Sequence, residues 1–311
     1  MRIVLPGALP DSTAAKALVP HLEKVAPTLL HWFARSRAKH VTADPAHTLC
    51  TPLEYWQLVQ RQYHPQDGLA ASAGLGPLIA HDDYSGDGPI WLLELVHLSA
   101  VREGAVLIPA QYLNVTDEDS TQLLASAGEL CKTAGFDVAP LSATHWRVQL
   151  PQGFTPRAAS PELVSLTNVN DWWSLDIAGR PWRRLSNELQ MLWFDHPVNE
   201  RRANQGLRPI NSVWLFGGAK PGQLQPVASD DNTVIDHSLV EPFQTQDWNG
   251  WLNALQELDA NVLAAIPSHT QPELVLTGHQ GFVTLKSERG ILAKLRRGTN
   301  TAWKKWWTNE R

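Results

Sequence analysis

The stretch NELQMLWFDHPVNERRANQGLRPINSVWLFGGA, residues 187–219, passes from a helix through a turn into a short apolar strand. Its helix begins near Pro181, where a first-turn proline belongs. It should end at His196, because a residue before proline disfavours the helical conformation. The strand 213–216 ends at a pair of glycines that lets the backbone turn sharply. A strand followed by such a turn is typical of sheets that bind ligands beyond their carboxyl ends.

The same alternation of helices and short apolar strands extends outward along the chain. Apolar runs predict strands at residues 2–5, 90–98, 105–108, 144–150, 213–216, 262–266 and 274–276. Helices are predicted at 14–25, 52–63, 116–133 and 181–196 and after Asp247, with Asp11 or Ser12 as the first N-cap. We therefore expect an α/β fold with a mostly parallel central sheet flanked by helices. One domain over residues 1–311 is expected, or two subdomains with a hinge near the proline-rich stretch 151–161.

The composition of the chain excludes several classes of protein. Hydrophobic residues make up 43% and charged residues 18% of the 311 residues, which indicates a folded chain with a substantial core. The net charge of −5 argues against a whole-surface grip on nucleic acid. Two cysteines, Cys50 and Cys131, exclude a disulfide scaffold and are interpreted as core residues, and the 14 tryptophans as large, rigid core fillers. No apolar stretch is long enough to span a bilayer and no signal peptide is recognisable, so we expect a cytoplasmic protein.

The opening stretch also carries a resemblance to a known family. Seven of its positions match a family pattern: His196, Pro197, Asn199, Arg202, Gly206, Asn211 and Gly217. The segment resembles the archaeal-type, cofactor-independent phosphoglycerate mutases of the alkaline phosphatase superfamily, and more closely the RpfE-type regulatory proteins related to them. The likeness extends to residues 91–98 and so spans roughly residues 90–219; within it, residues 94–98 read ELVHL where that family has Asp-Pro-Val-His-Leu. It implies a reduced, alkaline phosphatase-like scaffold.

The resemblance implies chemistry whose residues are missing here. Mutases of that superfamily use two divalent metals, held by Asp and His, and a Ser nucleophile, because phosphoryl transfer requires clamped oxygens. The first carboxylate after the first predicted strand is Asp11, which is better explained as a helix cap. Where the family has Thr-Gly-Asp-His, this chain has Thr-Gly-His279-Gln280, and glutamine is a poor ligand for a catalytic divalent cation. We therefore expect no catalytic residue and no metal ligand.

The turn around the opening strand supplies the candidate ligand-binding residues. They are Asn199, Arg201, Arg202, Asn211, Gly217 and Gly218. Arginine presents a planar fork to phosphate or carboxylate, and asparagine supplies both a donor and an acceptor. In the structural alternative, the asparagines tie down the loop and the arginines are solvated. The densest Asp/His region is either a metal site or an acidic surface loop, and it comprises Asp230, Asp231, Asp236, His237 and His269.

Three further features have alternative explanations. Residues 286–311 contain eight Lys or Arg against two Glu, together with Trp303, Trp306 and Trp307. This pattern suits either nucleic acid or an anionic membrane, or else a terminal helix whose tryptophans dock on the body. His97 is interpreted as a satisfied core histidine rather than a general base. His145 and Arg147 should share one face of their strand.

These observations predict a function without catalysis. We expect a regulatory or ligand-sensing protein, derived from a phosphoglycerate mutase-like scaffold, that binds a small anionic or phosphorylated ligand and needs no cofactor. The alternative is an active, metal-dependent, cofactor-independent phosphoglycerate mutase, which would require a divalent metal. A second alternative is nucleic-acid or anionic-membrane binding through the C-terminal residues.

Overall fold

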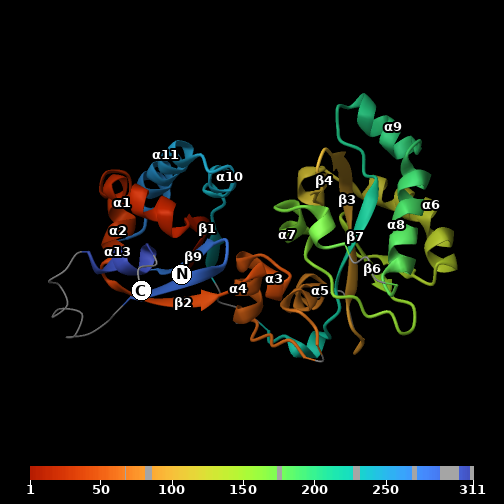
Figure 1. Ribbon diagram of the computed structural model, residues 1–311, viewed down its shortest axis with the longest axis horizontal. Helices are drawn as coiled ribbons and strands as arrows, with labels where there is room; N and C mark the ends of the chain where they lie inside the picture. The colour runs from red at the N-terminus through yellow and green to blue at the C-terminus, as the bar shows by residue number, and fades with distance from the viewer. Residues whose placement is uncertain are drawn as a thin grey trace. The chain divides into compact units, whose positions relative to one another are not determined.

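The chain divides into two compact units (Figure 1). A computed structural model describes residues 1–66, 68–80, 86–173, 177–226, 232–267, 272–287 and 301–308. Unit 1 comprises residues 1–45 and 227–311, and unit 2 comprises residues 46–226. The stretch 151–161, which the sequence offers as a hinge, lies inside unit 2.

Unit 1 is built on a mixed five-stranded sheet. Its strands are β1 (Arg2–Leu9), β2 (Ser36–Thr42), β8 (Thr233–Ile235), β9 (Glu273–Gly278) and β10 (Gly281–Ser287), in the order β2-β10-β9-β1-β8. Strand β1 runs parallel to β8 and β9, whereas β10 is antiparallel to both β9 and β2. The central position of β1 explains its continuous apolar sequence, because a central strand is buried on both faces.

The helices of unit 1 are set by local capping signals. They are α1 (Ser12–Val25), α2 (Pro27–Phe33), α10 (Val240–Gln244), α11 (Trp248–Leu258), the π-helical turn η5 (Asp259–Leu263) and α13 (Ala302–Trp307). Asp11 caps α1 by accepting from the backbone N–H of Thr13 and Ala14, and Asp247 caps α11 in the same way through Gly250. Both caps confirm the sequence prediction.

One predicted strand of unit 1 is wrong. Residues 259–263 continue α11 as η5, and the chain then turns, so the expected strand 262–266 does not form. A short apolar run cannot be assigned to a strand or a buried helix by periodicity alone. Asp259 fixes the helical choice, because its buried carboxylate accepts hydrogen bonds from the N–H groups of Thr28 and Leu29 at the start of α2.

The basic C-terminal segment packs onto unit 1 through its tryptophans. Trp303 and Trp307 are buried in the unit 1 core, and the Trp306 ring lies 5.0 Å from that of Phe33. Residues 301–308 thus match the docked-helix alternative; residues 288–300 and 309–311 lie outside the described part of the chain. None of the described helices combines the length and the apolar character needed to cross a membrane.

Unit 2 is built on an antiparallel sheet. Its strands are β3 (Trp91–Val101), β4 (Gly104–Ile108), β5 (Asp137–Pro140), β6 (His145–Gln149) and β7 (Ser212–Gly217). The order is β4-β3-β6-β5, with β7 also paired to the long strand β3. Every pair in this sheet is antiparallel.

The mostly parallel sheet expected from the sequence is therefore corrected to a mixed α/β fold. Among the described strands of unit 1, only the pairs β1–β8 and β1–β9 are parallel. Strands β3 and β4 are separated by two residues, and so are β9 and β10, and connections this short join antiparallel neighbours. Parallel neighbours need a long crossover instead, so these hairpin connections set the strand directions.

Helices cover both faces of the unit 2 sheet. They are α4 (Pro52–Gln60), α5 (Leu75–Ile79), α6 (Asp117–Thr133), α7 (Pro161–Ser165), α8 (Arg180–Trp193) and α9 (Pro197–Asn204); α3 (Pro45–Thr48) spans the boundary with unit 1. Helices α6 and α8 lie against one face of the sheet (Figure 1), and Trp146 of β6 and Trp193 of α8 are buried in the core there. Both cysteines are buried, as expected, and neither forms a disulfide.

Candidate functional site

Asn199, the first predicted ligand-binding residue, ties together the turn that follows α8. Its side-chain amide donates to the carbonyl oxygens of Trp193 and Ile210, each at 2.8 Å. Its carboxamide oxygen accepts from the N–H of Ile210, also at 2.8 Å. Because these bonds satisfy a buried side chain, Asn199 holds the turn as the structural alternative describes. A ligand-binding role for it stays a prediction.

Arg202 is a buried structural cation and not a solvated one. Its side chain is 1% exposed, and its guanidinium pairs with Asp119 of α6 at 2.8 Å. It also donates to three backbone carbonyl oxygens, those of Leu113, Asn114 and Arg208. A buried arginine needs such a complete set of acceptors, because leaving one charge unpaired is costly.

Arg201 approaches the same carboxylate from the surface. Its guanidinium lies 2.7 Å from Asp119 and 3.3 Å from the side-chain oxygen of Gln122. Burial acts to raise the pKa of Asp119, but the hydrogen bonds from Arg201 and Arg202 outweigh burial and hold that pKa below its ordinary value. Asn199, Arg201 and Arg202 all lie on α9, and the side chains of all three bond to groups of the protein itself; a ligand-binding role for the two arginines stays a prediction.

The other predicted residues lie at the two ends of β7. Asn211 pairs with the backbone of Leu98: its oxygen accepts from the Leu98 N–H at 2.7 Å and its amide donates to the Leu98 carbonyl at 2.8 Å. Gly217 and Gly218 have positive φ angles of 95° and 116°, where a side chain would collide with Ile90 or Trp91. Gly217 follows Asn211 by six positions of extended chain, about 20 Å at 3.3 Å per residue. These residues therefore do not converge on one pocket.

Asn211 gives a direct test of its structural role. Replacing Asn211 with alanine leaves the N–H and carbonyl of Leu98 unpaired, so we expect unit 2 to lose about 1 to 3 kcal/mol of stability. The measurement is urea unfolding, with Asn187→Ala on the exposed side of α8 as the matched control. Equal stability of the two variants would contradict the role assigned to Asn211.

The carboxyl edge of the parallel strands in unit 1 is where the resemblance implies metal ligands. The Asp11 carboxylate caps the N-terminus of α1, and the Asp236 carboxylate accepts a hydrogen bond from the Ser238 N–H at 2.9 Å. His279 stacks on Phe243 with ring centroids 4.3 Å apart; burial lowers its pKa, and the Asp11 charge acts against that shift. Gln280 follows, with a neutral side chain. These residues do not fit the two-metal site that the resemblance implies.

No group of three His, Cys, Asp or Glu side chains within the described ranges is arranged to hold a metal ion. From the Asp/His region of the sequence, Asp230, Asp231 and His269 lie outside those ranges.

The histidines of the unit 2 sheet have partners within the protein. His97 lies 2.9 Å from the Pro209 carbonyl oxygen, the partner expected of a satisfied histidine, but it is half-buried and not a core residue; burial lowers its pKa. His145 stands directly opposite Glu94 in the sheet, with the imidazole Nε2 3.4 Å from the carboxylate. His145 and Arg147 share a strand face opposite the buried Trp146, as their spacing predicts.

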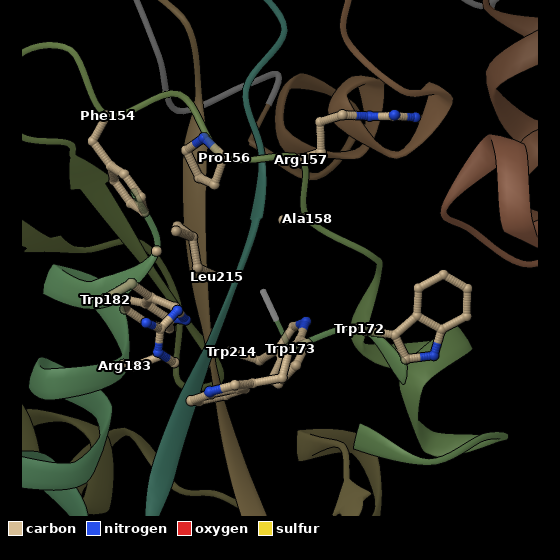
Figure 2. A pocket seen from close by; sticks show the side chains of 11 residues that line it. Phe154, Pro156, Arg157, Ala158, Trp172, Trp173, Trp182, Arg183, Trp214 and Leu215 are labelled. Atoms are coloured by element: carbon tan, nitrogen blue, oxygen red, sulfur yellow. The ribbon is translucent and has the colours of Figure 1, made fainter. Parts of the chain in front are cut away.

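The most distinctive concave feature of unit 2, which we call the tryptophan pocket, combines four indoles with two arginines. It is lined by Phe154, Pro156, Arg157, Ala158, Trp172, Trp173, Gly179, Trp182, Arg183, Trp214 and Leu215. Figure 2 shows the Trp173 and Trp214 rings beside one another, with Trp182 and Arg183 across from them. The Arg157 side chain extends away from these rings.

Two of the indoles of the tryptophan pocket are fixed by hydrogen bonds. Trp214 is buried and donates its indole N–H to the Ala159 carbonyl at 2.9 Å, and Trp172 donates to the Thr167 hydroxyl at 2.6 Å. Trp173 packs against Trp214 with ring centroids 5.6 Å apart. Trp172, Trp173 and Trp182 are half-buried, so each presents part of its ring to solvent.

The cavity at the centre of this pocket is small. Its volume is about 40 Å³, little more than the roughly 30 Å³ that one water molecule occupies in the liquid. A larger hollow of about 460 Å³ lies between α6 and α8, on the other side of the first turn of α8. The guanidinium of Arg184, which lines this hollow, is paired with Glu188 at 2.8 Å, and the Arg184 side chain is 79% exposed. The tryptophan pocket gathers four indoles and is the chemically richer candidate.

Sequence reasoning missed the tryptophan pocket. The signal available was the excess of tryptophan, 14 against 7 Phe and 4 Tyr, together with the adjacent pair Trp172-Trp173. Buried core fillers account for Trp146, Trp193 and Trp251, but not for the half-buried rings at this pocket.

Comparison with known proteins yields distant structural neighbours only. No protein-family model matches the chain, and no curated protein matches it. The cofactor-independent phosphoglycerate mutase from Thermoplasma acidophilum is 13% identical with a TM-score of 0.31, over 93% of this chain and 89% of that one. The PH0037 protein from Pyrococcus horikoshii is 10% identical with a TM-score of 0.46, over 96% and 89% of the two chains. The resemblance to RpfE-type proteins is not confirmed by these comparisons.

Proposed function

We propose that this chain is a non-catalytic binding protein, and that it takes a phosphorylated or otherwise anionic ligand with a flat ring at the tryptophan pocket. The observation that carries the proposal is that four indoles line one pocket together with Arg183 of α8, with the Trp173, Trp214 and Trp182 rings near one another (Figure 2). Stacking of a flat ring on tryptophan contributes about 1 to 3 kcal/mol per ring. A guanidinium adds charge-assisted hydrogen bonds to an anionic group.

The first turns of α8 make the mouth of the pocket positive. Arg183 lies near the N-terminus of α8 and lines the pocket, and the first turn of the helix contains no acidic residue. The helix dipole adds partial positive charge at that end, so Arg183 is unfavourably placed for the helix alone and favourably placed for a bound anion. Because the cavity itself is water-sized, the ligand ring lies across its mouth, against the half-buried Trp173 and Trp182.

The ancestry of the chain is part of the same proposal. A regulatory role of the RpfE type, and a reduced alkaline phosphatase-like scaffold, are supported by the sequence pattern of residues 187–219. On this proposal the positions that hold metals in the mutases have been reassigned, as with Asp11 in its helix cap.

The test separates the ring from the anionic group. Adenosine 5′-monophosphate is titrated into the full-length protein by calorimetry, with adenosine and inorganic phosphate as its two separate halves. We expect the nucleotide to bind more tightly than either half, and Arg183→Gln to weaken it about tenfold, the loss of one charge-assisted hydrogen bond. Arg37→Gln, an exposed arginine of unit 1, removes the same charge and should leave affinity unchanged.

Two results would contradict the proposal. One is nucleotide affinity that is absent at millimolar concentration or equal in Arg183→Gln and Arg37→Gln. The other is interconversion of phosphoglycerates that a chelator abolishes, which would establish the mutase alternative and remove the non-catalytic assignment.

A further inference from the structure

One wall of the tryptophan pocket is a short segment, residues 156–160, held at its far end by hydrogen bonds. Pro156, Arg157 and Ala158 line the pocket. The Ala158 carbonyl oxygen accepts from the Ser72 hydroxyl at 2.7 Å. We call residues 156–160 the wall segment.

The last two residues of the wall segment connect it to the rest of unit 2. The Ala159 carbonyl oxygen accepts from the indole N–H of Trp214, itself part of the pocket. The N–H of the fully buried Ser160 donates to the Leu49 carbonyl at 2.9 Å. A displacement of Ser160 would therefore reach the pocket lining through one residue.

A carboxyl group secures Ser160. Glu54 accepts, on one oxygen, from the Ser160 hydroxyl and from the Thr51 N–H, both at 2.7 Å. The Thr51 hydroxyl in turn accepts from the Glu54 N–H, which completes a capping box at the start of α4. Ser160 is the N-cap of α7, so Glu54 links the starts of two helices.

Two further carboxyl groups act on this link through their charges. The charge of Glu162 in α7 acts on Glu54, and the charge of Glu94 in β3 acts on Glu162. Within the described residues, the donors to Glu54 and Glu162 are neutral; for Glu162 the donor is the Gln111 amide at 2.7 Å. The imidazole near these groups, that of His145, faces Glu94. Like charges held close in a partly buried place repel, so a full set of ionised carboxylates is unfavourable here.

The protonation of Glu54 follows from this environment. Burial, the largest cause, raises the pKa of Glu54 to about 7, against the lowering effect of its hydrogen bonds from Ser160 and Thr51, and the Glu162 charge adds to the rise. Burial also raises the pKa of Glu162, with the Glu94 charge as the next cause. Burial keeps the neighbouring Cys50 thiol neutral by raising its pKa.

We propose that the proton on Glu54 holds the wall segment in place, so that the tryptophan pocket binds its ligand more tightly below neutral pH than above it. Loss of the proton leaves a charge near the Glu162 carboxylate at a half-buried place where hydration is incomplete. Hydrating that charge requires the start of α7 to move, and with it Ser160 and the pocket wall. The effect on ligand affinity rests on the proposed function; the motion of the wall segment does not.

The experiment is hydrogen–deuterium exchange of the ligand-free, full-length protein at pH 6 and pH 8, corrected for intrinsic exchange rates. Amides of residues 158–165 should open about tenfold more at pH 8 than at pH 6, as linkage predicts for a carboxyl whose pKa is about 7 when closed and ordinary when open. Glu54→Gln keeps the acceptor oxygen and should abolish this difference. Glu129→Gln, at an exposed position of α6, should retain it.

A second variant guards against a merely disturbed fold. Glu162→Gln removes the charge that repels an ionised Glu54. The amides of the same segment should therefore open less at pH 8 than they do in the wild type. Exchange that does not depend on pH, or that depends on it equally in Glu54→Gln, overturns the proposal. If exchange follows pH as expected while adenosine 5′-monophosphate fails to bind at pH 6, the proton-controlled wall is supported and the proposed function is the part that falls.

Discussion

Replacing Arg202 with methionine is expected to destabilise unit 2 by about 3 to 5 kcal/mol, the cost of removing one partner of a buried ion pair. Methionine approximates the length of the arginine stem but leaves the Asp119 carboxylate, 6% exposed, with one guanidinium instead of two. Three backbone carbonyls, those of Leu113, Asn114 and Arg208, lose their donor as well. The loss of stability is measured by hydrogen exchange of the α9 amides at increasing urea concentration.

The matched control for Arg202 is its neighbour. Arg201 contacts the same carboxylate but is 36% exposed, so Arg201→Met should cost only about 1 kcal/mol or less, as for surface pairs. Asp119→Asn combined with Arg202→Met should cost less than the sum of the two single changes, because the carboxylate is no longer left unpaired. Equal losses for Arg201→Met and Arg202→Met would contradict the structural role assigned to the buried guanidinium.

The second large effect is a dependence of stability on pH. Because burial raises the pKa of Glu54 in the folded chain from 4.5 to about 7, the folded state binds this proton more tightly than the unfolded state. The contribution of Glu54 is therefore fully present below pH 4.5 and is lost as pH rises through about 7. The whole shift corresponds to about 3 kcal/mol at 1.36 kcal/mol per pKa unit.

Glu54→Gln should therefore match the wild type near pH 4.5 and exceed it in stability by up to about 3 kcal/mol at pH 8. Urea unfolding of both proteins at four pH values between 4.5 and 8 measures this difference. Asp119 does not confuse the comparison, because its lowered pKa places its own stability loss below that range. A difference between the two proteins that stays constant with pH would refute the assignment to Glu54.

The sequence predicts the helices of this chain better than its sheets. Three helices begin at capping residues that the sequence shows. The side chains of Asp11, Thr116 and Asp247 accept from backbone groups only two or three residues away, at the starts of α1, α6 and α11. Such signals are local, so a single sequence contains them. The direction of a strand depends on which distant strand it joins, and strand β1 pairs with residues more than 230 positions away. That information is not present in a local pattern.

The candidate site shows the same division. The residues at 199–218 were recognisable by type, but what they contact was not: the partner of Arg202 lies 83 positions earlier in the chain. A guanidinium suits a phosphate and a carboxylate equally well, so sequence alone left both alternatives open. The tryptophan pocket is lined by residues that lie between positions 154 and 215. The signal for it in the sequence is the excess of tryptophan.

The placement of unit 2 within the sequence of unit 1 has a consequence for synthesis on the ribosome. Strand β1 leaves the ribosome first, yet both of its neighbours, β8 and β9, emerge after all of unit 2. Unit 2 is continuous in sequence, so its core can close while translation is still under way. Residues 1–45 must wait for that whole interval with an apolar strand unpaired, and an unpaired apolar strand is a site at which chains can aggregate.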